Sequence, residues 1–419
     1  MAIASSDRTI ITDLAKRVAE IGHDPLQAHN RDMWFRHNAL ERVKPMVLVF
    51  PEGAWQELLP ADRCLECQDP ALHGYEWHLR SLIYRWEHLR DDNVIEPRIR
   101  VNAVYNSTGW GVDVRHKESP IHGGAWAFDP VIRDYADLKK LRQPVMEMDE
   151  AATQRSLDFA CELFDGILEV ELYKKPYFDN SLLFTLCNFV GLDNLMLFVA
   201  DRPDFVHEAM SFMTAATLEM MDRAERQGWV QPNNRDDYVG SGGVGYSREL
   251  PTTGSPEKGY TFADCWGFAE AQEFALVSPD MHEEFVLQYQ IPMLDRYGLN
   301  CYGCCEALDN KFDIVFKVPR LRRLSISPWS DVRKSAEALG DRVIFSWKPN
   351  PADLASETFN PVLIASKIEQ CVSAASGCVL EIIMKDTHTV RGEPHRMSEW
   401  VRIAKEIADR GYPGWTPPA

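Results

Sequence analysis

No run of about 18 uncharged apolar residues, which a membrane-spanning helix requires, occurs in the 419-residue sequence. The first residues lack the apolar stretch and small-residue cleavage site of a secretory leader. Internal repeats and low-complexity tracts are missing as well. We therefore expect a cytoplasmic globular protein that neither spans a membrane nor is built from repeats.

Basic residues are in deficit, since 45 Lys and Arg stand against 63 Asp and Glu and give a net charge of −18 at pH 7. A field of that sign repels phosphate, so neither nucleic acid nor an anionic membrane is expected as a partner. Apolar residues make up 45% of the chain, which is ample for a large core.

Ten cysteines in such a chain indicate buried thiols, metal ligands or reactive groups rather than disulfides. A four-thiolate zinc site joining Cys64 and Cys67 to Cys301 and Cys304 is disfavoured, because the two pairs lie far apart and neither stands in a compact ribbon. Four cysteines stand singly in apolar segments and are predicted to be core residues: Cys161, Cys187, Cys371 and Cys378.

Strand-like apolar runs alternate with helix-like stretches along the chain. In the last third, strands are predicted at 299–305, 322–327, 342–347 and 378–384, and helices near 309–318, 330–338, 360–374 and 396–409. Earlier strand candidates lie at 46–50, 98–105, 166–172 and 260–266, and long helices at 75–89, 151–164 and 203–228.

This alternation predicts an α/β fold with a parallel sheet covered by helices. Eight strand candidates favour a (β/α)8 TIM barrel, and an open doubly wound sheet is the alternative. Residues 1–45 are expected to form an N-terminal helical extension, and residues 46–419 the barrel.

The stretch "GSGGVG" matches a dinucleotide-binding pattern at Gly240, Gly242 and Gly245. A dinucleotide fingerprint needs a following helix whose N-terminus binds pyrophosphate, and "YSRELPTTGSP" does not predict one. We interpret residues 240–259 as a flexible loop over a site and as the segment that moves to admit a ligand.

The stretch "CYGCCE" at 301–306 ends a predicted strand, which is where a barrel carries its chemistry. Strand alternation predicts Tyr302, Cys304 and Glu306 on one face, so that a thiol and a carboxylate converge. A redox role for Cys301 with Cys304 is less favoured, because such thiol pairs usually work from a helix N-terminus.

The last predicted strand runs into "MKDTHTVRGEPH". His388 in that loop could join Cys304 and Glu306 in a sulfur, oxygen and nitrogen set with a fourth position open, which suits catalytic zinc. A solvated loop histidine is the alternative interpretation.

The segment "ALVSPDMHEEFVLQYQIPMLDRYGLNCYGCCE" at 275–306 resembles the uroporphyrinogen decarboxylase superfamily, in which a Ser-Pro, a helix and a strand ending in His-x-Cys-Gly follow one another. Residues 191–228 resemble the preceding helices of that superfamily, and the resemblance spans roughly 180–410. It implies a (β/α)8 barrel, in agreement with the alternation.

The superfamily holds porphyrinogen decarboxylases and zinc-dependent methyltransferases that work with corrinoid proteins. The decarboxylases carry an arginine-bearing segment near the N-terminus, whereas the comparable residues 44–60 contain no arginine. A chain of net charge −18 without that clamp is a poor host for an octa-anionic porphyrinogen, so decarboxylation is not expected.

In the thiol-methylating members, the zinc ligands correspond here to Tyr302, Cys304 and a position near Asp386 to His388, so only Cys304 is retained. The departure favours a methyl donor or acceptor other than a thiol. The resemblance thus implies a zinc-dependent methyltransferase that moves a methyl group from a small methylated substrate, such as a methoxylated aromatic, to Co(I) of a separate corrinoid protein.

Zinc is expected on Cys304, Glu306 and His388, with Tyr302, Asp386 and Lys348 as catalytic groups that support it or donate a proton. Polar and aromatic residues at predicted strand ends are candidates for binding the substrate: Asn106, Trp110, Asp264, Trp266 and Trp347. Transfer from methyl-corrinoid to an acceptor and a non-catalytic barrel that binds a tetrapyrrole or corrinoid remain open, as does a homodimer.

Overall fold

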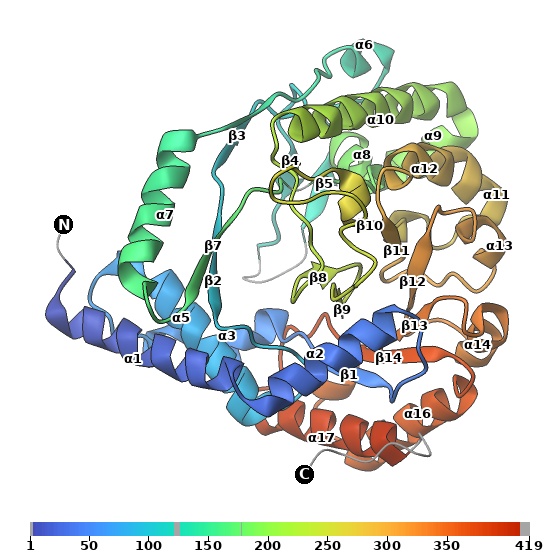
Figure 1. Cartoon of the computed structure of the whole chain (residues 1–419). Coiled ribbons are helices and arrows are strands. Elements are labelled where there is room, and N and C mark those ends of the chain that lie inside the picture. The colour runs from blue at the N-terminus through green and yellow to red at the C-terminus, as the bar shows by residue number, and fades with distance from the viewer. Residues whose placement is uncertain (1–2, 121–125, 177, 411–419) are drawn as a thin grey trace.

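The computed structural model describes residues 3–120, 126–176 and 178–410 (Figure 1). Six parallel strands form one sheet, in the order β1 (Met46–Val49), β14 (Val379–Met384), β13 (Ile344–Trp347), β12 (Leu321–Ile326), β11 (Leu299–Tyr302) and β10 (Trp266–Ala269). Strands β2 (Arg98–Asn102) and β7 (Glu169–Tyr173) form a separate parallel pair. Figure 1 shows this pair across the molecule from β11 and β12.

Three antiparallel strand pairs complete the strands: β3 (Tyr105–Ser107) with β6 (Met146–Met148), β4 (Arg115–Lys117) with β5 (Ala127–Asp129), and β8 (Tyr238–Val239) with β9 (Gly243–Val244). Figure 1 shows the last of these in the middle of the molecule, between β7 and the large sheet.

The helices alternate with the strands from β10 to the last helix, as the sequence predicts, but not between β2 and β5. They are α1 (Ser5–Gly22), α2 (Pro25–Asn38), α3 (Trp55–Leu58), α4 (Ala61–Cys64), α5 (Pro70–Tyr84), α6 (Tyr135–Leu138), α7 (Glu150–Phe164), α8 (Leu183–Val190), α9 (Leu192–Asp201), α10 (Pro203–Arg226), α11 (Pro279–His282), α12 (Gln288–Leu294), α13 (Phe312–Val315), α14 (Val332–Leu339), α15 (Ala352–Ala355), α16 (Pro361–Ala374) and α17 (His395–Arg410).

Four helices begin with proline after a capping side chain, and in one of them, α11, Ser278 accepts from the backbone N–H of Met281. Asp24, Asp69 and Asn360 accept backbone N–H bonds from Leu26, Ala71 and Leu363 ahead of α2, α5 and α16. Proline suits the first helical position because it lacks the N–H that would be unsatisfied there.

Side chains alternate along β14 between two surroundings. Leu380, Ile382 and Met384 belong to the core between the sheet and its helices, together with Trp400 of α17. Glu381 points to the other side, where its carboxylate meets Arg323 of β12. Full burial of each such aliphatic side chain contributes roughly 1.5–3 kcal/mol, so this outer layer stabilises the sheet.

The predicted parallel α/β arrangement is confirmed, and it is compatible with a TIM-barrel-like fold. A closed barrel is not observed. Over the residues that the structure describes, no strand pairing joins β1 to β2 or β7 to β10. One strand begins later than predicted. The sequence predicts a strand at 260–266, whereas β10 begins at Trp266. Thr261 and Asp264 form a reciprocal capping box around a short 3-10 turn, which delays the strand.

Side chains satisfy the free edge of β1. The backbone N–H groups of Val47 and Val49 donate to Asp92 and Asp91 at 2.9 and 3.1 Å, and Arg85 donates to the Val49 carbonyl at 2.7 Å. Buried backbone groups need partners, and here carboxylates take the place of a neighbouring strand.

The free edge of β10 is satisfied in the same way. The Asn233 amide accepts from Trp266 N at 2.8 Å and donates to Trp266 O at 3.2 Å, as a strand neighbour would. Asn180 Nδ2 donates to the Phe268 carbonyl at 3.1 Å. The sheet therefore stays open between β7 and β10 without leaving these groups unpaired.

The glycine-rich segment 240–245 is buried between strands, so the prediction that it forms a flexible loop is wrong. A Cβ on Gly240 would lie 2.6 Å from the Cβ of Cys301, and one on Gly242 would lie 2.6 Å from Ile383 Cγ2. Glycine is required at these positions because β11 and β14 approach the backbone so closely.

The N-terminal helical segment contacts the large sheet through α2. His37 Nε2 lies 3.1 Å from Glu381 Oε2, and Asn38 Nδ2 donates to the carbonyls of Val244 and Tyr246. The predicted boundary at residue 45 stays a prediction.

Among the described helices, none alone has the length and apolar composition needed to cross a membrane. Helices α8 and α9 meet both criteria only when joined, and they meet at a bend of 100°.

Candidate active site at the carboxyl ends of the strands

Strand β11 ends at Gly303, where the backbone turns with φ +83°. The predicted strand alternation therefore stops at Tyr302 and does not govern the residues that follow. Cys304 and Cys305, expected on opposite faces, lie with their sulfurs 3.6 Å apart.

Tyr302 points away from this site. Its hydroxyl donates to Gln290 Oε1 at 2.9 Å and lies 2.7 Å from His282 Nε2, in the layer between the sheet and the helices. The structure thus does not place Tyr302 beside the other predicted catalytic groups.

Cys304 lies among hydrogen-bond donors. Its sulfur is 3.3 Å from Ser241 Oγ and 3.6 Å from Lys385 Nζ. The hydrogen bond from the Cys305 thiol, together with Lys385 and Ser241, lowers the pKa of Cys304 despite burial. These contacts favour the thiolate form of Cys304.

Two lysines follow neighbouring strands beside this thiolate. Burial lowers the pKa of Lys348 to about 7, and its ammonium donates to the Ser346 carbonyl at 3.2 Å. Burial alone would also lower the pKa of Lys385, but Tyr238, Cys304 and Asp386 together raise it. At neutral pH, Lys385 is fully charged and Lys348 is poised near its midpoint.

Asp386 lies at the same mouth, with one carboxylate oxygen 3.5 Å from Lys385 Nζ and the other 3.6 Å from the Cys305 sulfur. A pocket of about 150 Å³ opens here. Its lining combines the charged and thiol groups with an aromatic rim: Cys304, Cys305, Lys348, Lys385, Asp386 and Trp329. Cys304, Lys348 and Asp386, three of the predicted residues, are thus brought together.

Glu306 lies behind the turn instead of facing the pocket. Its two carboxylate oxygens accept from the backbone N–H groups of Ala271 and Cys304, each at 2.9 Å. Burial raises the pKa of Glu306, and burial together with the charge of Glu306 raises that of Glu270. By accepting the hydrogen bond from the Cys304 N–H group, the Glu306 carboxylate holds the Cys304 backbone in place.

The predicted zinc ligands are not assembled. His388 is exposed and lies against Gly53, while both Glu306 oxygens face backbone donors. Across residues 3–120, 126–176 and 178–410, no three side chains of His, Cys, Asp or Glu are arranged to hold a metal ion. The Lys385 ammonium lies 3.6 Å from the Cys304 sulfur.

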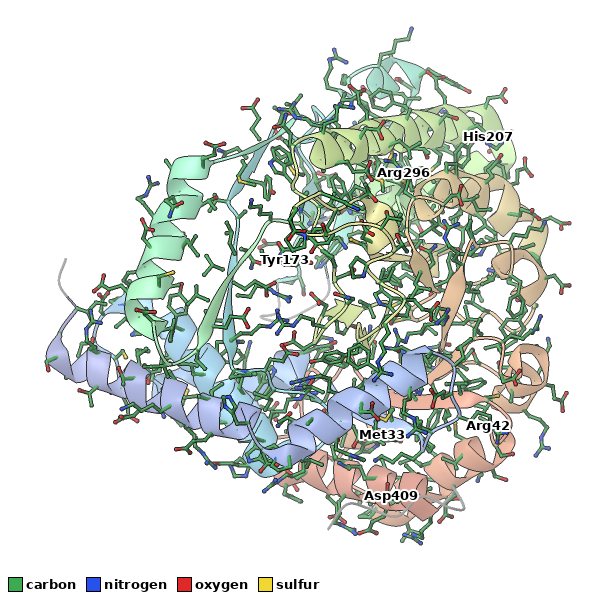
Figure 2. All side chains as sticks on the ribbon, in the orientation of Figure 1. Met33, Arg42, Tyr173, His207, Arg296 and Asp409 are labelled. Atoms are coloured by element: carbon green, nitrogen blue, oxygen red, sulfur yellow. The ribbon has the colours of Figure 1, made fainter. Side chains whose placement is uncertain are left out.

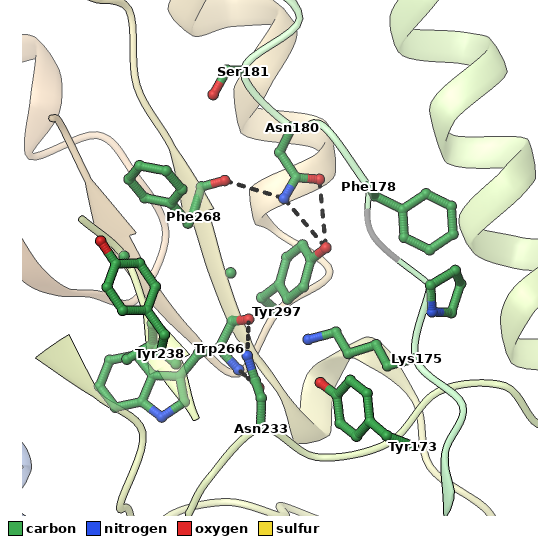
Figure 3. A pocket seen from close by; sticks show the side chains of 14 residues that line it. Tyr173, Lys175, Phe178, Asn180, Ser181, Asn233, Tyr238, Trp266, Phe268 and Tyr297 are labelled. Atoms are coloured by element: carbon green, nitrogen blue, oxygen red, sulfur yellow. Dashed lines mark hydrogen bonds between the residues drawn. The ribbon is translucent and has the colours of Figure 1, made fainter. Parts of the chain in front are cut away.

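A larger cavity of about 470 Å³ lies beside β10 and the end of β7 (Figure 3). We call it the aromatic cavity, because its lining includes Tyr173, Phe178, Trp266, Phe268 and Tyr297. Figure 2 shows Tyr173, the last residue of β7, between β7 and β10. Tyr238 and Gly240 also line it, and the next residue, Ser241, contacts Cys304. Trp266 is thus a cavity residue.

The other predicted substrate-binding residues lie elsewhere. Asn106 is exposed in the β3–β6 strand pair, and Trp110 packs against Phe189 and Phe212. Asp264 accepts bonds from the backbone of residues 252–254, and Trp347 lines a surface groove beside α14 and α16. These side chains have structural contacts and do not reach the pocket of Cys304.

Sequence reasoning missed Lys385, Ser241 and Lys175. Lys385 directly follows β14, so the rule that chemistry collects at strand ends could have found it. Ser241 is hidden in the glycine-rich segment, and Lys175 follows β7 by two residues.

No family model matches the chain, and no curated protein matches it. Among solved structures, a methyltransferase from Methanosarcina mazei superposes with a TM-score of 0.46 at 10% identity, covering 90% of this chain and 98% of that one. A superposition at this level carries no argument about the reaction, which must come from the residues at the strand ends.

Proposed function

We propose that the protein is a methyltransferase that moves a methyl group from a small methylated substrate, such as a methoxylated aromatic, to Co(I) of a separate corrinoid protein. The observation that supports this proposal is the pair of lysines, Lys348 and Lys385, beside the Cys304 thiolate at the carboxyl ends of the strands.

The chemistry needs positive charge at the leaving oxygen. As the electron pair of Co(I) forms the bond to carbon, the O–CH3 bond breaks and its electrons stay on oxygen. An alkoxide or phenolate leaves slowly unless that charge is neutralised. Lys348, with a pKa of about 7, can donate the proton, and Lys385 supplies a fixed positive charge.

Cys304 and Asp386 act through Lys385 in this proposal. Their negative charges keep the ammonium protonated and hold it between them at 3.6 and 3.5 Å. The zinc requirement stays a prediction from the sequence. No step is assigned to zinc, because Glu306 and His388 do not lie beside Cys304 in a ligand arrangement.

Exposed aromatic side chains at the rim favour a flat partner such as a corrin ring. Trp329 at the pocket of Cys304 is 73% exposed, and Tyr238, which lines the aromatic cavity, is 49% exposed, although large aromatic side chains are usually covered. Transfer in the opposite direction, from methyl-corrinoid to an acceptor, would use the same groups.

The test mixes the protein with a corrinoid protein reduced to Co(I) and with methoxylated aromatics, methylamines and methyl thioethers in turn. One class is expected to convert the Co(I) absorption to that of methyl-Co(III). Lys348→Met should slow this conversion by about a hundredfold or more, the usual contribution of a general acid. Lys334→Met, at an exposed lysine of α14, is the matched control.

Two results would count against the proposal. If Co(I) persists with every donor, and the methylated corrinoid protein also transfers to no acceptor, the non-catalytic binding role takes its place. If Lys348→Met turns over as fast as Lys334→Met, the proton comes from another group.

A further inference from the structure

The aromatic cavity lies where the sheet is open, between the end of β7 and β10. Figure 3 shows the rings of Trp266, Phe268 and Tyr297 on one side and those of Phe178 and Tyr173 on the other. A cavity of about 470 Å³ with such walls fits a flat, largely apolar ring, because aromatic faces stack on one another.

Lys175 supplies the positive charge in the wall of the aromatic cavity. Figure 3 shows its side chain extending into the cavity, and its ammonium lies 5.8 Å from the ring centroid of Tyr297. Within the described part of the chain, no Asp or Glu forms an ion pair with it. Its polar neighbour is the buried Cys265 thiol, whose pKa is raised by burial in spite of Lys175.

The amides in the wall are already bonded. Asn233 is paired with the backbone of Trp266, and Asn180 with the Phe268 carbonyl and the Tyr297 hydroxyl. Apart from Lys175, the polar side-chain groups of the lining without a hydrogen bond in the described part of the chain are the Tyr173 and Tyr238 hydroxyls. A ligand must therefore be apolar over most of its surface and carry its negative charge at one end.

We propose that the aromatic cavity binds a planar aromatic carboxylate, with its ring among the aromatic side chains and its carboxylate on Lys175. The ring would lie against Tyr238 and Gly240, one residue from Ser241, which contacts Cys304. The inference depends on the proposed function only in treating this ligand as the methyl donor, since binding itself requires no turnover.

Isothermal titration calorimetry of the protein alone tests the assignment, with 4-methoxybenzoate and its neutral relative 4-methoxybenzyl alcohol as probes. The wild-type protein should bind the carboxylate about tenfold more tightly, because a charge-assisted hydrogen bond is lost with the alcohol. Lys175→Met should remove this preference while the alcohol binds as before. Lys174→Met, at the exposed neighbouring lysine, makes the same change of charge and should keep the preference.

Three results would overturn the assignment: no binding of either probe, equal binding of both by the wild-type protein, or tighter binding of tetramethylammonium than of the carboxylate. The last would show an aromatic cage that selects cations. If 4-methoxybenzoate binds through Lys175 but no methyl group reaches Co(I), the proposed function fails and the binding site stands. If methyl transfer proceeds without such binding, only the cavity assignment fails.

Discussion

Removing the Arg323 side chain should destabilise the protein strongly, because it would leave a buried carboxylate without its cation. The Arg323 guanidinium donates to the two oxygens of Glu381 at 2.9 and 3.1 Å and to Asn38 Oδ1 at 2.7 Å. Arg323 and Glu381 are both fully buried, and Glu381 is also bonded by His37 and Ser346.

Breaking a buried ion pair by removing one partner costs roughly 3–5 kcal/mol. Two polar neighbours of Glu381 remain in Arg323→Met, so the lower end, about 3 kcal/mol at pH 7, is expected. Burial raises the pKa of Glu381, but Arg323 and His37 hold it well below its usual value. Without Arg323 the pKa rises, and protonation then relieves the penalty, so the loss should shrink between pH 7 and pH 5.

Urea unfolding followed by tryptophan fluorescence at both pH values measures this loss. Arg402→Met serves as the control, since its pairs with Glu399 and Glu406 lie on the exposed face of α17, and no measurable change is expected. Replacing Arg323 and Glu381 together by Met should recover part of the loss. A loss equal to that of the control, or one that is the same at pH 7 and pH 5, would refute this reasoning.

Three further outcomes are expected. The rate of methyl transfer should fall above pH 7, by about tenfold per unit, as Lys348 loses its proton, and a rate that rises there in stopped-flow assays would contradict its role as an acid. Gly240→Ala should lower the free energy of unfolding by roughly 1–3 kcal/mol more than Gly228→Ala, which has the same φ of +65° but open space around it; equal losses would contradict the close packing. Elemental analysis tests the zinc predicted from the sequence: about one zinc per chain that is lost in both Cys304→Ser and His388→Ala would confirm the predicted ligand set, and full zinc in both variants would refute it.

Most strands of the large sheet could be predicted because they are apolar runs, and some helices carry a start signal. The run 378–384 predicts β14, and proline at 361 after a capping asparagine predicts α16. Closure of the barrel could not be predicted, since the free edge of β1 is satisfied by Asp91 and Asp92 from more than 40 positions later. Side-chain partners at such distances leave no periodic pattern in the sequence.

The site residues likewise include some that the sequence predicts correctly and some that it does not. Cys304, Lys348 and Asp386 follow strands that the sequence marks, and the structure brings them to one pocket. Strand alternation does not extend past Gly303, where the backbone turns, so Cys304 and Glu306 do not share a face with Tyr302 as predicted. A positive φ at a single glycine is enough to break the period of two on which that prediction depended.

The open edge of β10 and the aromatic cavity have a common cause. In a closed barrel, β7 would pair with β10, and the two strands would stand about 4.8 Å apart with no room for a ring between them. Here Asn233 and Asn180 satisfy the β10 backbone from one side only, so β7 can lie further away and Tyr173 and Lys175 line a cavity instead of a strand pair. The β8–β9 hairpin packs closely against Cys301 of β11 and Ile383 of β14, and its turn carries Ser241 to Cys304. The asparagine side chains that take the place of a strand neighbour therefore leave room for the aromatic cavity, which the hairpin connects to Cys304 and the two lysines.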